Sequence, residues 1–332
     1  MPLQPFVVSL GDPAGVGPEI TARAWEARAM ADLPPFVAVG DIGSIRAVWD
    51  GPVVQVDSAE AAPSLFADAL PVWHIEDCGE ITPGVPSLEG AHCALHSLEL
   101  GVGVARSGQA EGLITAPVCK DQLYKVGFTH AGQTEFIADR CGVSRTNAVM
   151  MLAGPGLKVV PITVHVPLRE VPGLLSVELV VARAQATARG MARSFGIDNP
   201  RLALAGFNPH AGENGAIGTE EIDILIPAIE RLREEGLDIS GPHSPDALFT
   251  PAARQGYDAA LCCYHDQALI PLKALYFDDG VNLTLGLPIV RTSPDHGTAF
   301  NIAGQGKASA GPMIAAIKMA EEIARTRAAG CS

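Results

Sequence analysis

The chain has 332 residues, of which 48% are hydrophobic and 18% are charged, a composition typical of a protein that folds around apolar cores. At roughly 100–200 residues per domain, this length predicts about two domains. The 37 acidic residues outnumber the 23 basic ones, and no cluster of lysine and arginine is long enough to bind a phosphate backbone nonspecifically. Nucleic acid is therefore not an expected partner.

The cysteines and the apolar segments indicate the compartment. The seven cysteines form no Cys-x-x-Cys motif, and their number is odd, so the sequence predicts neither a disulfide framework nor a structural zinc knuckle. The N-terminal residues lack the basic and long apolar segments of a signal peptide. The most apolar stretch, residues 148–166, is interrupted by two prolines and a lysine, so no membrane span is expected. We expect a reduced, cytoplasmic protein of enzyme size.

Short apolar runs alternate along the chain with longer, alanine-rich amphipathic stretches. In chain order these patterns predict strand 5–10, helix 18–29, strands 36–39 and 53–56, helix 88–106, strand 112–115, helix 135–141, strand 159–165, helix 177–195, strand 201–207, helix 220–235, strand 259–264 and helix 312–327. Strands that alternate with helices of ten or more residues favour an α/β fold with a largely parallel sheet.

A glycine-rich segment follows the first predicted strand. Residues 11–18 read Gly-Asp-Pro-Ala-Gly-Val-Gly-Pro, and Pro18 suits the first turn of the helix that follows. The glycine spacing matches neither the dinucleotide-binding fingerprint nor the Walker A loop. Two interpretations stay open, a structural turn and a loop that lets the backbone approach a ligand.

Three histidines lie at the ends of predicted strands. His165 is the last residue of one strand, and His210 and His265 come just after two others. In an open α/β sheet, ligands bind outside the carboxyl ends of the strands, so the three imidazoles are expected at one edge. Imidazole nitrogens suit Zn²⁺, Co²⁺ and similar ions, and three protein ligands leave open positions for a substrate. The pattern predicts a catalytic metal site. Five other histidines lack this strand-end placement and are interpreted as ordinary residues: His74, His92, His96, His130 and His243.

A polar tract lies near the end of the chain and includes Lys273, Asn282, Arg291 and residues 292–298. Lysine and arginine beside amide and hydroxyl donors suit a phosphate or a carboxylate, and arginine can hold such a group with two parallel donors. The alternative is a solvated loop with ordinary surface charges.

Other polar residues are candidates for substrate binding or proton transfer. Gln133 and Thr134 begin a predicted helix, where the threonine either caps the helix or presents donors to an anion. Asp246 and Asp266 are candidate acid–base groups, and Asp266 directly follows a proposed metal ligand, so it is equally suited to orienting that histidine.

Taken together, these segments resemble the 4-hydroxythreonine-4-phosphate dehydrogenase family of vitamin B6 biosynthesis. The matching segments, in order along nearly the whole chain, are GDPAGVGPEI, ITAPVCK, ITVHVPLR, NPHAGENGAIGTEE, CYHDQALIPLK and NLTLGLPIVRTSPDHGTAF. Each segment alone is only modestly specific, whereas the ordered set is highly specific.

The resemblance implies a two-domain α/β fold like that of the isocitrate and isopropylmalate dehydrogenases, with a cleft between the domains. The first domain would comprise residues 1–130 and 290–332, and the second, residues 131–289, would carry the metal ligands and the dimer contacts. It also implies a homodimer whose metal site is shared between the subunits. The positions that match the family's metal ligands are His165, His210 and His265, and those that match its substrate contacts are Thr134, Lys273, Asn282 and Arg291. Where the family usually has histidine, this chain has Gln133, which donates hydrogen bonds but cannot carry a proton charge.

The implied activity is an NAD- or NADP-dependent oxidation that requires a divalent metal ion (Zn, Mg or Co). The small phosphorylated substrate, 4-phosphooxy-L-threonine, would give 2-amino-3-oxo-4-phosphooxybutanoate, which loses CO₂ to form 3-amino-2-oxopropyl phosphate. Asp246, Asp266 and a metal-bound hydroxide are the candidate bases. Alternatives are a dehydrogenase of threonate or erythronate phosphate, a phosphate acyltransferase on the same fold, and a binding protein without catalysis.

Overall fold

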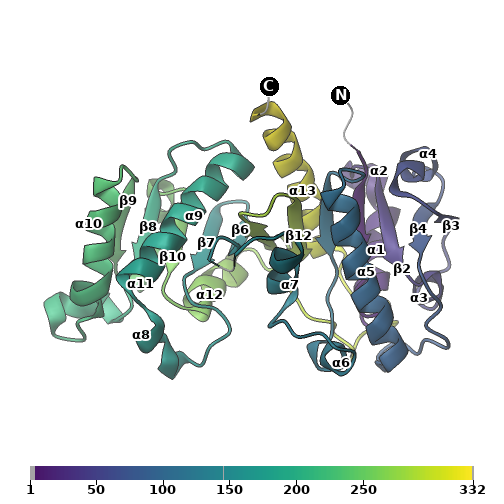
Figure 1. Ribbon diagram of the computed structural model, residues 1–332, viewed down its shortest axis with the longest axis horizontal. Coiled ribbons are helices and arrows are strands. Elements are labelled where there is room, and N and C mark those ends of the chain that lie inside the picture. Colours follow the sequence, from purple (N-terminus) through teal and green to yellow (C-terminus); the bar gives the residue numbers. More distant parts are fainter. Residues whose placement is uncertain (1–3, 145, 331–332) are drawn as a thin grey trace. The chain divides into compact units, whose positions relative to one another are not determined.

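The computed structural model describes residues 4–144 and 146–330 (Figure 1). The chain divides into two compact units, Met1–Gly142 with Leu287–Arg325, and Val143–Gly286 with Thr326–Ser332. The chain passes between the units after residues 142, 286 and 325, whereas the sequence resemblance implies boundaries after residues 130 and 289. Residues 131–142 belong to the first unit. They remain in the first unit because Gln133 and Thr134 form hydrogen bonds with other residues of that unit.

The first unit is built on a parallel sheet in the order β3-β4-β2-β1-β5-β12. Its strands are β1 (Phe6–Ser9), β2 (Phe36–Gly40), β3 (Val53–Val56), β4 (Leu70–His74), β5 (Gly112–Thr115) and β12 (Val290–Pro294). The central strands are buried along their whole length, as in parallel sheets with both faces covered. The carboxyl ends of these strands therefore share one edge.

Helices flank this sheet. They are α1 (Gly17–Glu26), α2 (Arg28–Ala31), α3 (Ile42–Arg46), α4 (Ala62–Leu65), α5 (Leu88–Arg106), α6 (Lys120–Lys125), α7 (Gln133–Arg140) and α13 (Gly311–Gly330), with a 3-10 turn at Ala59–Ala61. Helix α5 packs along β1, β2 and β5 (Figure 1). It begins where the Ser87 hydroxyl accepts a hydrogen bond from the amide of Gly90, which satisfies an amide that has no partner within the helix.

The second unit has a mixed sheet in the order β11-β6-β7-β10-β8-β9. Its strands are β6 (Val149–Gly154), β7 (Leu157–Pro161), β8 (Leu202–Ala205), β9 (Ile239–His243), β10 (Ala259–Cys262) and β11 (Val281–Leu285). Strands β11, β6 and β7 are antiparallel neighbours, whereas β7, β10, β8 and β9 run parallel. The segments that follow β7, β10 and β8 therefore leave the sheet at one edge.

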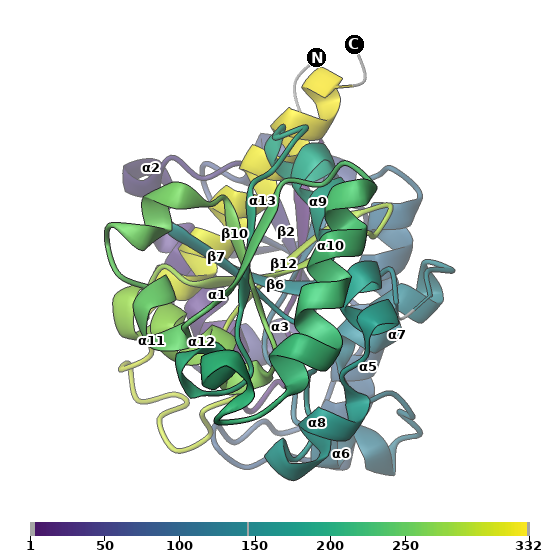
Figure 2. The ribbon, with the colours of Figure 1, turned by 90° about the vertical axis from the view of Figure 1, so that its left-hand side faces the viewer.

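The helices of this unit are α8 (Val171–Leu174), α9 (Val177–Phe195), α10 (Ile226–Glu234), α11 (Pro245–Leu248) and α12 (His265–Leu275), with 3-10 segments at Leu168–Glu170, Pro209–Gly215 and Ala253–Gly256 and a π-helical turn at Glu221–Leu225. Helix α9 packs on β6 and β11 and lies beside α10 (Figure 2). Ser176 caps its start, and Gly196 in the left-handed conformation ends it.

The α/β fold predicted from the sequence is confirmed. Three predicted strand ends need correction, because the strands end at Pro161, Ala205 and Cys262 and the histidines lie beyond them, in a loop, a turn and the first residue of α12 respectively. Among the described residues, no helix is both long enough and apolar enough to cross a membrane.

Close packing of α9 on β11 gives a stability prediction. A Cβ added at Gly190 would lie 2.7 Å from the Cβ of Leu285, whereas one added at the exposed Gly103 of α5 would meet nothing within 4 Å. We expect Gly190→Ala to destabilise the protein by about 1–3 kcal/mol through overpacking, despite alanine's better helix propensity. The matched Gly103→Ala should stabilise it by roughly 0.5–1 kcal/mol. Urea unfolding of both variants measures this, and equal effects of the two substitutions would contradict it.

Candidate functional site

A pocket in the second unit is formed by the segments that follow β7 and β10. The residues that line it are Thr163, His165, Val166, Leu168, Val171, Tyr264, His265 and Asp266. The rings of His165 and His265 lie 5.7 Å apart, centroid to centroid. His165 also has a left-handed backbone, with φ of 55°, which is uncommon for a residue that carries a Cβ. The structure thus brings together two of the three histidines that the sequence singled out.

Asp266 fixes the orientation of His265. Its Oδ1 lies 2.7 Å from Nδ1 of His265, and both residues belong to the first turn of α12. A proton on Nδ1 would satisfy this contact and leave the lone pair of Nε2 for a ligand, as in carboxylate–histidine–metal arrangements. The contact supports the orienting role considered for Asp266.

Hydrogen bonds that the sequence did not predict hold the strand ends behind this pocket. The Thr163 hydroxyl donates to the carbonyl of Cys263 at 2.8 Å. Gln267 accepts from the amide of Cys263 at 2.7 Å and donates to the carbonyl of Gly206 at 2.8 Å. Gln267 is only 7% exposed, so this amide ties the end of β10 to the end of β8. The sequence gives no distinct signal for this role, because Gln267 is one of several polar residues in α12.

His210 lies apart from the other two histidines. Its side chain is 63% exposed, and its Nδ1 is 3.9 Å from Oε1 of Glu213. It is not among the described residues that line the pocket of His165 and His265. A hydrogen bond from the Ser244 hydroxyl lowers the pKa of the exposed Asp246, and the charge of His210 acts in the same direction. The turn that carries His210 packs against α11, the helix that carries Asp246.

The other candidate binding residues of this unit lie on α12 and β11. Lys273 is half-buried near the end of α12. Asn282, in register with Leu152 on β6, is also half-buried, and its side-chain oxygen is inaccessible to solvent and accepts no hydrogen bond from the described residues. Such a buried acceptor is suited to a ligand donor.

The first unit holds a separate cluster of candidate substrate contacts. Arg291 on β12 donates to the hydroxyl of Thr115 at 2.8 Å and to that of Thr134 at 3.5 Å. Burial lowers the pKa of Arg291 to about 10, and the charge of Glu135 opposes the shift, so the guanidinium stays charged at neutral pH. Gln133, beside Thr134 at the start of α7, donates to the carbonyl of Ala116 at 3.2 Å. Thr115 is a further residue of this cluster that the sequence did not reveal.

The glycine-rich segment 11–18 packs against the polar tract 292–298. The amide of Val16 donates to the carbonyl of Thr298 at 3.0 Å. A Cβ at Gly11, where φ is 69°, would lie 2.2 Å from the carbonyl oxygen of Pro117, so this glycine is explained by backbone packing. Burial raises the pKa of Asp12, and its hydrogen bond from Ala14 opposes that shift. These contacts favour the structural-turn interpretation.

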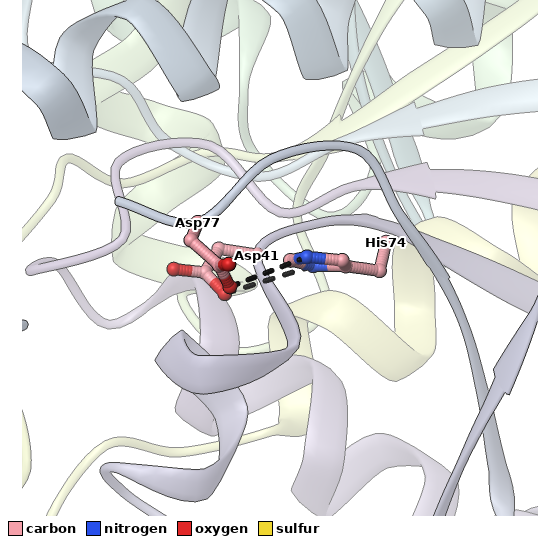
Figure 3. Close-up of side chains that lie close together, drawn as sticks. All are labelled: Asp41, His74 and Asp77. Atoms are coloured by element: carbon pink, nitrogen blue, oxygen red, sulfur yellow. Dashed lines mark ion pairs between the residues drawn. The ribbon is translucent and has the colours of Figure 1, made fainter. Parts of the chain in front are cut away.

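Asp41, His74 and Asp77 form a group in the first unit whose oxygen and nitrogen atoms are close enough to hold a metal ion (Figure 3). The amide of Ile42 donates to Nδ1 of His74 at 3.2 Å, and Nε2 lies 3.3 Å from Asp77. A neutral ring that accepts at Nδ1 carries its proton on Nε2, which leaves no lone pair for a metal. Asp41 also caps α3 through the amide of Gly43. The group is therefore best explained as a hydrogen-bonded link between loops.

Comparison with known proteins identifies the family. Residues 34–320 match the family described as pyridoxal phosphate biosynthetic protein PdxA. A 4-hydroxythreonine-4-phosphate dehydrogenase of Zymomonas mobilis is 54% identical over 327 residues, covering 98% of each chain. The chain belongs to the PdxA family. This confirms the resemblance carried by the sequence segments.

Solved structures agree with membership of the PdxA family. The crystal structure of 4-hydroxythreonine-4-phosphate dehydrogenase from Klebsiella pneumoniae has a TM-score of 0.85 at 34% identity, covering 97% of this chain and 98% of that one. A terephthalate 1,2-cis-dihydrodiol dehydrogenase from Burkholderia xenovorans has a TM-score of 0.62 at 28% identity, with 96% and 97% covered. Similar chains thus include dehydrogenases of different substrates.

Proposed function

We propose that this chain is a 4-hydroxythreonine-4-phosphate dehydrogenase of pyridoxal phosphate biosynthesis. It oxidises the secondary alcohol of 4-phosphooxy-L-threonine, with NAD or NADP as hydride acceptor, to 2-amino-3-oxo-4-phosphooxybutanoate. This β-keto acid loses CO₂ to give 3-amino-2-oxopropyl phosphate. The full-length identity of 54% to a dehydrogenase of that name is the observation that carries the proposal.

Arg291 supports a substrate with a phosphate or carboxylate. Arg291 is only 4% exposed, and Thr115 and Thr134 orient its guanidinium. Burying a cation is costly unless it meets polar or anionic partners. In a protein with a formal charge of −14, a buried arginine beside a helix start is suited to an anion, and Gln133, Lys273 and Asn282 complete the proposed substrate contacts.

The donor set of the second unit fits a divalent metal ion. Asp266 orients His265 so that Nε2 is available, and His165 and the exposed His210 supply further imidazoles, which suit zinc or cobalt better than magnesium. When bound, such an ion would polarise the substrate's hydroxyl oxygen and lower its pKa. Asp246 is the proposed proton acceptor, because Asp266 is engaged with His265, whereas Asp246 lies on α11, which packs against the turn that carries His210.

A homodimer would complete this site. His165 and His265 share a pocket within one chain, whereas His210 lies on the surface outside it. We propose that the metal site combines histidines of two subunits, which explains the exposure of His210 without requiring a rearrangement of its own chain.

Activity with defined substrates tests the proposed function. Metal-loaded protein should reduce NAD or NADP with 4-phosphooxy-L-threonine, followed by absorbance of the reduced nucleotide. The phosphates of threonate and erythronate test the closest alternative function, a dehydrogenase of phosphorylated sugar acids. Gln133, which stands where the family usually has histidine, suggests this alternative. Preference for either sugar acid, or acyl transfer from an acyl-CoA to phosphate without a nucleotide, would refute the proposed substrate.

Arg291→Lys should lower kcat/KM by roughly 10- to 150-fold, equivalent to ~1.5–3 kcal/mol, because lysine keeps the charge but loses the two-pronged donor geometry. The melting temperature should fall moderately, because the hydroxyl of Thr115 or that of Thr134 loses its donor. Arg46→Lys, an exposed position on α3 of the same unit, is the matched control and should leave both quantities unchanged. Steady-state kinetics with a thermal melt provide the measurement, and wild-type kcat/KM in Arg291→Lys would exclude Arg291 from the substrate site.

A further inference from the structure

The turn that carries His210 has an unusual backbone. Five consecutive residues, 210–214, have φ between 42° and 77°, and only Gly212 among them lacks a Cβ. This left-handed conformation is disfavoured for residues that carry a Cβ, and it persists only where surrounding contacts fix it. Some part of the second unit must therefore hold the turn in place.

The contact that fixes the turn is the buried carboxylate of Glu221. Glu221 lies at the start of the π-helical turn before α10 and is 2% exposed. Its Oε1 accepts from the backbone amide of Asn208 at 2.7 Å, and its Oε2 accepts from the side-chain amide of the same residue at 2.9 Å. The side-chain amide also donates to Oε2 of the neighbouring Glu220 at 2.7 Å, whereas the backbone amide is held by Glu221. These hydrogen bonds fix both the backbone and the side chain of Asn208.

Asn208 passes this constraint to the histidine. Its carbonyl accepts a hydrogen bond from the amide of Ala211 at 3.1 Å. This bond links the backbone before His210 to the backbone after it. The turn also lies directly over the carboxylate, because a Cβ added at Gly212 would be 2.7 Å from Oε2 of Glu221. Glu221 itself is buried, whereas the side chain of His210 is exposed on the surface.

We propose that Glu221 is a positioning residue for the His210 imidazole, and that it sets metal affinity without contacting the metal. This inference rests on the metal site proposed above. A buried carboxylate at this position shapes the backbone of a ligand loop, so its loss should weaken metal binding in the way that loss of outer contacts does in other metal sites.

The test measures Co²⁺ affinity of the full-length, metal-free protein by isothermal titration calorimetry. Glu221→Gln keeps the size of the side chain but places an amide nitrogen opposite one of the two Asn208 donors, so it should weaken Co²⁺ binding by about 10- to 100-fold. Asp223→Asn is the matched control, because it removes the same charge from an exposed position on the same π-helical turn. Its Co²⁺ affinity should equal that of the wild type.

Two further variants make the result decisive. In a His210→Ala background, Glu221→Gln should cause no additional loss of affinity, whereas an effect on the fold alone would add to that of His210→Ala. Asn208→Ala, which removes the side-chain donor from the other partner, should reproduce the loss if Glu221→Gln does not fold. Wild-type affinity in the folded Glu221→Gln or Asn208→Ala variant, with reduced affinity in His210→Ala, would overturn the positioning role and leave the metal site intact. Absence of Co²⁺ binding by the wild type would instead refute the metal site itself.

Discussion

The carboxyl ends of β8 and β10 are tied together by one buried side chain, the amide of Gln267. The Gln267 side chain accepts a hydrogen bond from the backbone amide of Cys263, after β10, and donates one to the carbonyl of Gly206, after β8. Backbone groups just beyond a strand have lost their partners in the sheet, and buried ones must find others. His265 lies between Cys263 and Gln267, and His210 follows Gly206 by four residues. The positions of both imidazoles therefore depend on the hydrogen bonds of Gln267 and on those between Glu221 and Asn208.

Buried polar groups hold irregular segments in both units. In the first unit, Arg291 and Thr115 link adjacent strands, and Thr134 joins them from α7. A buried cation and hydroxyls aimed at one point are suited to an anion, whereas imidazoles at the strand ends of the second unit are suited to a metal. The candidate anion-binding groups and the candidate metal-binding groups of the proposed reaction thus belong to different sheets.

The sequence predicted what local patterns determine. Helices α5 and α9 were predicted with the observed ends because serine caps, apolar periodicity and, for α9, Gly196 mark them. Strand β12 was missed because Arg291 interrupts its apolar character, and α12 was missed because Pro271 lies inside it. In both cases tertiary contacts override the local signal.

The candidate site shows the same division. The histidines were recognisable because three of them follow strands in a way that chance placement rarely gives. Gln267, Asn208 and Glu221 were not recognised, because their roles arise from hydrogen bonds between distant positions that no spacing rule predicts. The bond of Gln267 to Gly206 spans 61 positions, and the bonds between Asn208 and Glu221 span 13. The candidate ligand residues leave a pattern in the sequence, whereas the residues that hold them in place are recognised only from the fold.

The location of bound metal tests the central claim most directly. Crystals grown with Zn²⁺ and measured on both sides of the zinc absorption edge should show an anomalous peak about 2.0–2.2 Å from imidazole nitrogens of His165, His210 and His265, with at least one of them supplied by a second subunit. A peak at Asp41, His74 and Asp77 with none at these three histidines would contradict the account.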